Sequence, residues 1–148
     1  MSSLGSHLLF PSIEWFEALK QIVNDDTEFR SFGTVEAEMG IKVGSKVFVI
    51  TFEAFECTQV RTGSIDDLIN LDFHLELTES DWKELIENTK INNGADRQHT
   101  LNTLDLMKED GLAHNAAGDQ LRGDIFFRIN QSLQHYFDLS AQINTVFE

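Results

Sequence analysis

The histidines are the first side chains in this sequence that could carry acid–base chemistry. Four of them stand at positions 74, 99, 114 and 135, far apart in the chain, and His7 lies near its start. A zinc site made from them would need convergence in the folded protein, because zinc motifs usually bring two ligands from within a few residues. His99 follows a polar run at a predicted helix start, and His114 shares a predicted strand face with Leu112 and Ala116. We therefore take His114 and His99 as candidate catalytic residues and predict no metal site.

A pair of carboxylates is the second candidate. If Val43 lies opposite Lys46 across a turn at Gly44-Ser45, the hairpin register sets Glu36 opposite Glu53. Two ionised carboxylates at that distance repel, which raises one pKa and suits a general acid and base. With Glu38 they could instead hold a divalent cation. The alternative, which we favour, is an ordinary solvated sheet face in a chain with 25 acidic residues.

The familiar catalytic motifs are missing. The sequence contains no GxGxxG, P-loop, GxSxG or HExxH pattern, so it predicts no cofactor. Cys57 is the single cysteine, which excludes an intramolecular disulfide and a multi-cysteine zinc site. A lone cysteine fits a reducing compartment, and we predict a cytoplasmic protein.

Composition restricts the partners. The formal net charge is -14 with only 11 Lys plus Arg, so the surface repels nucleic acid and anionic membranes. No apolar run approaches the roughly 20 residues of a membrane span, and the first residues lack a signal-peptide pattern, which predicts no stable membrane insertion. Hydrophobic residues make up 41% of the 148 residues. They predict one domain over 11–148 after a flexible tail over 1–10.

Apolar periodicity predicts the elements that position these residues. Helical spacing starts after Ser12, a candidate N-cap, and Thr78 is the N-cap of a helix that runs to about Thr89. Two further helices are predicted over 95–107 and 119–146. Alternation predicts strands over 34–43, 46–52, 56–61, 72–77 and 112–116. The fold class is then α+β, with a five-stranded, mostly antiparallel sheet and helices packed on one face.

A family resemblance adds to this reading. The segment LDFHLELTESDWKELIENTK is an alternating strand that runs into a capped helix, and LNTLDLMKEDGLAHNAAGDQ adds a helix, a short strand after Gly111 and a Gly-Asp helix start. This order resembles the sterol carrier protein type two domain family. The resemblance implies an apolar cavity between the sheet and the helices that holds a fatty acyl chain, a sterol or another lipid. The C-terminal residues Thr145 to Glu148 lack the family's peroxisomal tripeptide, and the final helix is longer and more polar than the family's.

The predicted function is the binding and carrying of an apolar small molecule in that cavity. The alternative is a cavity enzyme that acts on a steroid- or terpenoid-like substrate through His114, His99 or the Glu36/Glu53 pair. A third hypothesis is an interaction module that forms a homodimer through the C-terminal helix. The predicted ligand-binding residues come from the hairpin and the last two helices: Phe48, Ile50, Phe52, Leu101, Leu104, Met107, Phe126, Ile129, Leu133 and Phe137.

Overall fold

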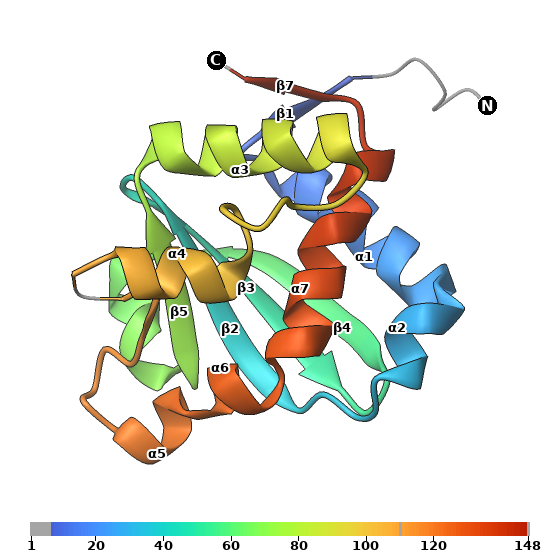
Figure 1. The fold of residues 1–148 in the computed structure, drawn as a ribbon. Coiled ribbons are helices and arrows are strands. Elements are labelled where there is room, and N and C mark those ends of the chain that lie inside the picture. The colour runs from blue at the N-terminus through green and yellow to red at the C-terminus, as the bar shows by residue number, and fades with distance from the viewer. Residues whose placement is uncertain (1–6, 110, 148) are drawn as a thin grey trace.

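A five-stranded sheet forms one layer of the protein, and the computed structural model describes it within residues 7–109 and 111–147. Its strands are β2 (Ala37–Val43), β3 (Lys46–Glu53), β4 (Glu56–Gly63), β5 (Phe73–Leu77) and β6 (Ala113–His114). They lie in the order β4-β3-β2-β5-β6, and only the central β2–β5 pair is parallel. Helices cover one face (Figure 1). The predicted α+β class and the mostly antiparallel sheet are confirmed.

The hairpin register is as predicted. Val43 pairs with Lys46 and Ala37 with Phe52, so Phe48, Ile50 and Phe52 face the helices in the main core. The other face of the sheet is not bare. Val47 and Val49 are buried there beneath a short helix, η1 (Ile65–Asn70), and form a second, small core with Leu68 and Leu71.

The helical layer consists of α1 (Ile13–Asp25), α2 (Thr27–Ser31), α3 (Glu79–Asn92), α4 (Leu101–Met107) and α7 (Asn130–Asp138). The side chain of Ser12 accepts a hydrogen bond from the amide of Trp15, and that of Thr78 accepts one from Asp81, both at 3.1 Å. These are the two predicted N-caps. Each satisfies an amide that has no carbonyl partner in the first turn of its helix.

Both ends of the chain form strands. Leu8–Phe10 is β1 and pairs in parallel with β7 (Thr145–Phe147), and Phe10 is 4% exposed. The prediction of a flexible tail over 1–10 is therefore wrong for Leu8–Phe10, because Phe10 packs into the aromatic core; residues 1–6 lie outside the described residues. The β1/β7 ribbon runs along α3 (Figure 1).

Two predicted helices have different bounds. The helix predicted over 95–107 begins only at Leu101, because Asn93 ends α3 in the left-handed conformation and Thr100 caps α4. The helix predicted over 119–146 is broken into α5 (Gln120–Gly123), α6 (Ile125–Arg128), α7 and η2 (Leu139–Gln142), followed by β7. Asp124 is the boundary residue between α5 and α6, and Ile129, at φ -109° and ψ 15°, leaves the helical conformation between α6 and α7. The long helix on which the predicted homodimer rested is not formed.

The strand β4 lies at one edge of the sheet, against α1. The side-chain amide of Asn24, near the end of α1, bonds both backbone groups of Cys57: its oxygen accepts from the N–H at 2.8 Å and its nitrogen donates to the carbonyl at 2.9 Å. The β3–β4 register shifts between Thr51 and Phe52, which makes a bulge beside this contact. Cys57 itself is buried, and burial raises the pKa of its thiol to about 12.

None of the helices described here is both long enough and apolar enough to cross a membrane.

Candidate functional site

The predicted ligand-binding residues lie mainly in the interior. Those that are buried in the core are Phe48, Ile50, Phe52, Leu101, Phe126, Leu133 and Phe137. Leu104 and Ile129 are partly buried and pack against that core. Met107 is 71% exposed, so its assignment to an internal lining is wrong. Residues spaced by three drift about 60° per step around a helix, which turns Met107 some 120° away from Leu101.

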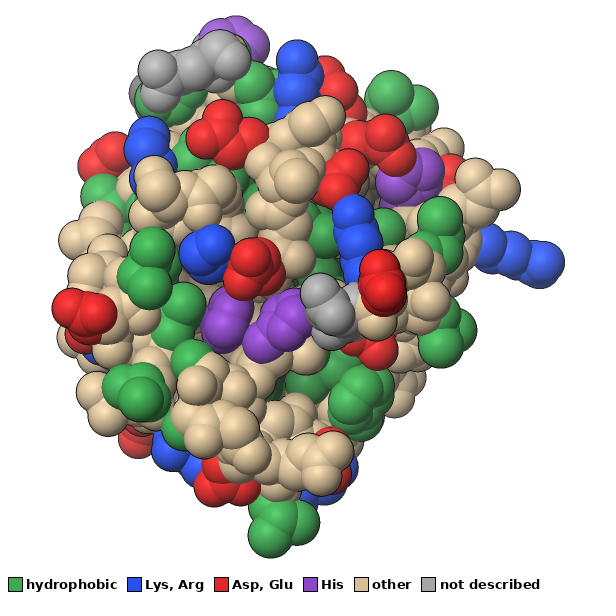
Figure 2. Space-filling model, turned by 90° about the vertical axis from the view of Figure 1, so that its left-hand side faces the viewer, with side chains coloured by type: hydrophobic (Ala, Val, Ile, Leu, Met, Phe, Trp, Pro, Cys, Tyr) green, Lys and Arg blue, Asp and Glu red, His purple; other side chains and the backbone are tan. Residues whose placement is uncertain are grey.

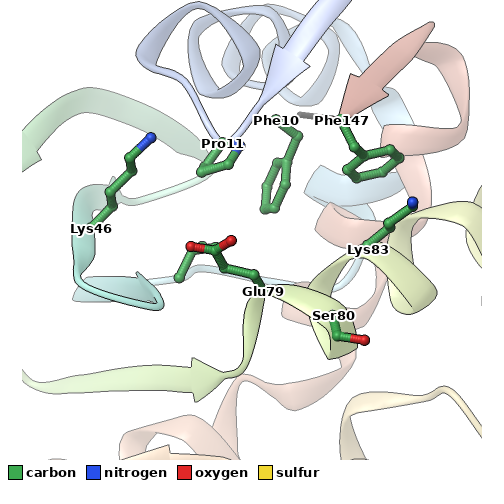
Figure 3. Close-up of a pocket in the computed structure, with 8 residues that line it drawn as sticks. Phe10, Pro11, Lys46, Glu79, Ser80, Lys83 and Phe147 are labelled. Atoms are coloured by element: carbon green, nitrogen blue, oxygen red, sulfur yellow. The ribbon is translucent and has the colours of Figure 1, made fainter.

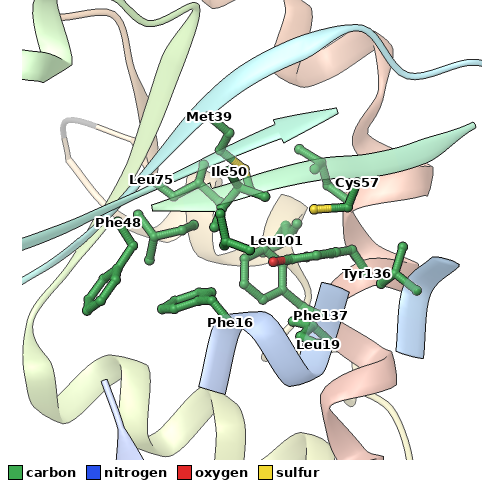
Figure 4. Packing of buried hydrophobic residues seen from close by; sticks show 14 of the residues in the cluster. Phe16, Leu19, Met39, Phe48, Ile50, Cys57, Leu75, Leu101, Tyr136 and Phe137 are labelled. Carbon is green, nitrogen blue, oxygen red and sulfur yellow. The ribbon is translucent and has the colours of Figure 1, made fainter. Parts of the chain in front are cut away.

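Aromatic side chains fill the layer between the sheet and the helices (Figure 4). Ring centroids are 4.8 Å apart for Phe16 and Phe48, and 5.4 Å apart for Phe52 and Tyr136. Among the predicted lining residues only Leu104 and Met107 line one of the pockets described here, a hollow of about 210 Å³ between α3 and α4. The internal cavity therefore stays a prediction.

The candidate catalytic residues are not brought together. His99 lies between α3 and the turn before α4, where Nδ1 is 2.7 Å from Asp96 Oδ1 and Nε2 is 2.6 Å from Glu84 Oε2. The hydrogen bond with Asp96 is the main cause that raises the pKa of His99; burial opposes it, and the hydrogen bond with Glu84 raises the pKa further. Because both ring nitrogens are occupied by carboxylates, His99 is held as part of the surface structure.

His114 lies at the opposite edge of the sheet from β4. It pairs with His74 across β5 and β6, with the rings stacked at 5.4 Å. Glu76 lies 3.2 Å from His74 Nε2 and 3.2 Å from Lys42 Nζ. Figure 2 shows one face of the molecule on which histidine, acidic and basic side chains gather side by side. His74 is 5% exposed, and burial lowers its pKa. Gly40 on the adjacent strand leaves the room that His74 occupies.

The β2–β3 register ends at Ala37 and Phe52, before the predicted Glu36/Glu53 pair, and the two carboxylates have separate partners. Glu36 accepts the amide hydrogen bond of Ala54 at 2.9 Å, and Glu53 accepts the hydroxyl of Thr58 at 3.1 Å. Glu38 is exposed. Within residues 7–109 and 111–147, no group of three or more His, Cys, Asp or Glu side chains converges as a metal site requires. The geometry offers no combined acid–base centre from the four candidates.

A pocket of about 450 Å³ lies where the β1/β7 ribbon, the β2–β3 turn and the start of α3 meet (Figure 3). We call it the α3 pocket. Its apolar lining is Phe10, Pro11, Val43 and Phe147, and its polar lining is Lys46, Glu79, Ser80 and Lys83. Phe10 and Val43 belong to the main core, so the floor of the pocket is one end of that core.

Two tryptophans hold this pocket in place. Trp82 of α3 donates from Nε1 to the carbonyl of Lys42 at 2.8 Å, which joins the helix to the end of β2. Trp15 of α1 donates to Thr145 Oγ1 at 2.9 Å, which joins that helix to β7. Phe10 packs against both rings, with centroids 4.8 Å from Trp15 and 6.4 Å from Trp82. Every wall of the pocket is thus anchored to buried residues.

The rim carries charge of both signs. Lys46 and Lys83 face the pocket from β3 and α3, and the Lys83 ammonium lies 5.5 Å from the centre of the Phe147 ring. The carboxylate of Glu79 lies over the turn, where a Cβ on Gly44 would be 2.8 Å from its Oε1. An apolar floor with two cations at its rim can hold a molecule that has a hydrocarbon part and a polar end.

A second pocket of about 320 Å³ continues along α3. Its lining comprises His7, Ile86, Glu87, Lys90, Ile91, Asn144, Thr145 and Phe147. The ammonium of Lys90 donates to the carbonyl of Ala141 at 2.9 Å and to Asn144 Oδ1 at 3.2 Å, which fixes the chain that leads into β7. We call this hollow the distal pocket.

Comparison with known proteins establishes the architecture. A scan of protein-family models and a search of curated proteins both find no match to the sequence. A crystal structure of sterol carrier protein 2 superposes with a TM-score of 0.63 over 88% of this chain and 95% of its own, at 15% identity. The chain has the sterol carrier protein 2 fold. The solution structure of a conserved hypothetical protein from Thermus thermophilus, named as a possible sterol carrier protein, gives 0.59 at 15% identity, over 91% and 90% of the two chains.

The α3 pocket could not be found from sequence periodicity. Its floor combines Phe10, from the predicted tail, with Phe147, which lies just beyond the predicted last helix. The triplets Leu8–Phe10 and Thr145–Phe147 are short apolar and β-branched runs of the kind that form strands. That signal was present, but nothing local shows that two runs at opposite ends of the chain pair with each other.

Proposed function

We propose that the protein binds and carries an apolar small molecule of the lipid class, and that the α3 pocket receives it. The observation that carries this proposal is a hollow of about 450 Å³, in the usual size range of small-molecule sites, in which a small apolar floor meets a larger polar rim. Two structures that bear the sterol carrier name share the fold of this chain, which supports the proposal of lipid binding.

The part of the pocket that suits hydrocarbon is its floor, where Phe147 is half-buried beside Phe10 and Val43 of the core. Each methylene buried against Phe10, Val43 and Phe147 contributes about 0.8 kcal/mol. A short buried chain therefore gives useful affinity without a buried charge. The polar end of the ligand stays at the rim, where Lys46, Lys83 and Ser80 can donate hydrogen bonds.

A carrier binds and releases its ligand without a chemical step, whereas the alternative, a cavity enzyme, needs catalytic residues beside the ligand. His99, His114, Glu36 and Glu53 do not line the α3 pocket. A ligand bound there meets three charged side chains, of which Glu79 and Lys83 come from the same helix. The groups present can orient and release a molecule.

The test is equilibrium binding of a long-chain fatty acid and a long-chain alcohol, each carrying its own fluorophore. Ser80→Trp places a large ring in the α3 pocket from an exposed helix position. It should weaken binding by about tenfold or more, because losing the burial of two methylenes already costs about that much. Asn92→Trp is the matched control, since Asn92 is exposed on the same helix and lines neither pocket.

The outcomes separate function from location. Failure of the parent protein to bind either probe refutes the carrier function. Binding by the parent that Ser80→Trp leaves unchanged refutes the α3 pocket as the place. Native mass spectrometry of the purified protein, with a co-purified lipid as the expected result, gives an independent reading of the ligand class.

A further inference from the structure

Helix α3 presents one stripe to both pockets. Glu79 and Lys83 line the α3 pocket, whereas Ile86 and Lys90 line the distal pocket. Successive members of this series are three or four residues apart, which places them on one side of a helix over a length of about 16 Å. The two hollows are therefore consecutive stretches of one groove along α3, with the β1/β7 ribbon beside it (Figure 1).

Phe147 is the one residue that the two described linings share. Its ring is held from both sides of the groove, because it packs on Phe10 with centroids 6.1 Å apart and lies under the Lys83 ammonium. Figure 3 shows the ring beside Lys83 at the edge of the α3 pocket. A side chain so placed separates the two hollows.

We propose that Phe147 sets the length of the apolar chain that the protein accepts, by closing the α3 pocket against the distal pocket. This inference rests on the proposed function of the α3 pocket. With Phe147 in place, a chain longer than the α3 pocket must leave its last carbons in water. With the ring removed, the same chain can continue over Ile86 and Ile91, which line the distal pocket.

Other residues at this boundary are less able to set a limit. Lys83 is exposed, and a lysine side chain moves at little cost, so it cannot exclude a hydrocarbon chain. Thr145 lines only the distal pocket and is bonded to Trp15. Of these three residues, only Phe147 places a rigid ring, with two side-chain torsions, between the two pockets.

The experiment measures affinity across a series of straight-chain primary alcohols of increasing length, by competition with the fluorescent alcohol. While each added methylene is buried, affinity should rise by about fourfold per carbon, and it should level off once the chain reaches Phe147. Phe147→Ala should move that break to a longer alcohol by several carbons. Val146→Ala is the matched control, because Val146 is a neighbour in β7 that is 39% exposed and lines neither pocket.

A second substitution at the same position tests whether an effect of Phe147→Ala comes from the missing ring or from disruption of β7. Phe147→Trp keeps an aromatic ring at the boundary and should leave the break at the parent length or shorten it. A break that stays at the parent length in a folded Phe147→Ala protein overturns the inference while the carrier function stands. Failure of the parent to bind both the alcohol and the fatty acid refutes the proposed function instead. Thermal unfolding of all variants confirms that each is compared as a folded protein.

Discussion

Replacing Gly40 with alanine tests the packing of the outer sheet face. Gly40 pairs with His74 across β2 and β5. A Cβ at position 40 would lie 2.9 Å from His74 Cβ, 2.9 Å from Leu71 Cδ1 and 3.0 Å from Leu68 Cδ2. Carbon atoms pack at roughly 3.5–4.0 Å, so all three contacts are too short. The leucine methyls can turn aside, but His74 Cβ is fixed to the backbone of β5.

The size of the effect follows from that difference. Relief of the contact with His74 Cβ requires β2 and β5 to move apart, and inserting a methyl into a packed core costs about 1–3 kcal/mol. Alanine also lowers the conformational entropy of the unfolded chain, which stabilises the folded protein by about 0.4–1 kcal/mol. The net expected loss of unfolding free energy is about 1–2 kcal/mol. For a chain of this size that lowers the melting temperature by roughly 2–8 °C.

Urea and thermal unfolding measure the change, with Gly123→Ala as the control. A Cβ on Gly123 meets nothing closer than Asn115 Cβ at 3.4 Å, and the residue ends α5 without a positive φ. The same chemical change should therefore leave stability unchanged or raise it there. If Gly40→Ala is as stable as the parent, the close approach of β2, β5 and η1 described above is wrong.

Three other predictions concern titration, an unpartnered hydroxyl and a cap. Nuclear magnetic resonance titration should place the pKa of His99 above 6.5 and that of His74 below it. His99 therefore stabilises the fold below pH 6.5 and loses that effect as the pH rises through its folded pKa. Buried His74, in contrast, destabilises the fold as the pH falls below 6.5. A His99 pKa below 6.5 or a His74 pKa above it contradicts the prediction. Tyr136→Phe should leave the unfolding free energy unchanged or raise it by about 1 kcal/mol, because the buried hydroxyl has no hydrogen-bond partner among the described residues. A lower unfolding free energy in urea would show that the hydroxyl does have a hydrogen-bond partner. Thr78→Ala should cost on the order of 1 kcal/mol, and an unchanged denaturation midpoint excludes the cap.

Local signals in the sequence were sufficient for much of the fold. The turn at Gly44-Ser45 and the alternation around it settle the β2–β3 register, because a slip by one residue would turn Phe48 and Ile50 to the other face. The N-caps at Ser12 and Thr78 are equally local, since the cap and the amide that it binds are three residues apart.

Long-range pairings limited the prediction of the rest. The alternation over 72–77 does not show that η1 folds over the outer face of the sheet, where His74 is 5% exposed. The prediction of one last helix failed because the chain breaks at Asp124 and again at Ile129, and the apolar pattern does not show those breaks. The site residues Phe10 and Phe147 meet only because the two ends of the chain pair as strands. These contacts depend on tertiary structure, which periodicity does not encode.

The contact between Asn24 and Cys57 has a consequence for how the molecule avoids aggregation. An edge strand is a template on which a second chain can add by backbone pairing. On β4 the side-chain amide of Asn24 already takes both backbone groups of Cys57, as a residue of a sixth strand would, and the adjacent bulge interrupts the edge further. This protection belongs to α1, not to the sheet. Detachment of α1 is thus the event that would open this edge of the sheet to intermolecular β-pairing.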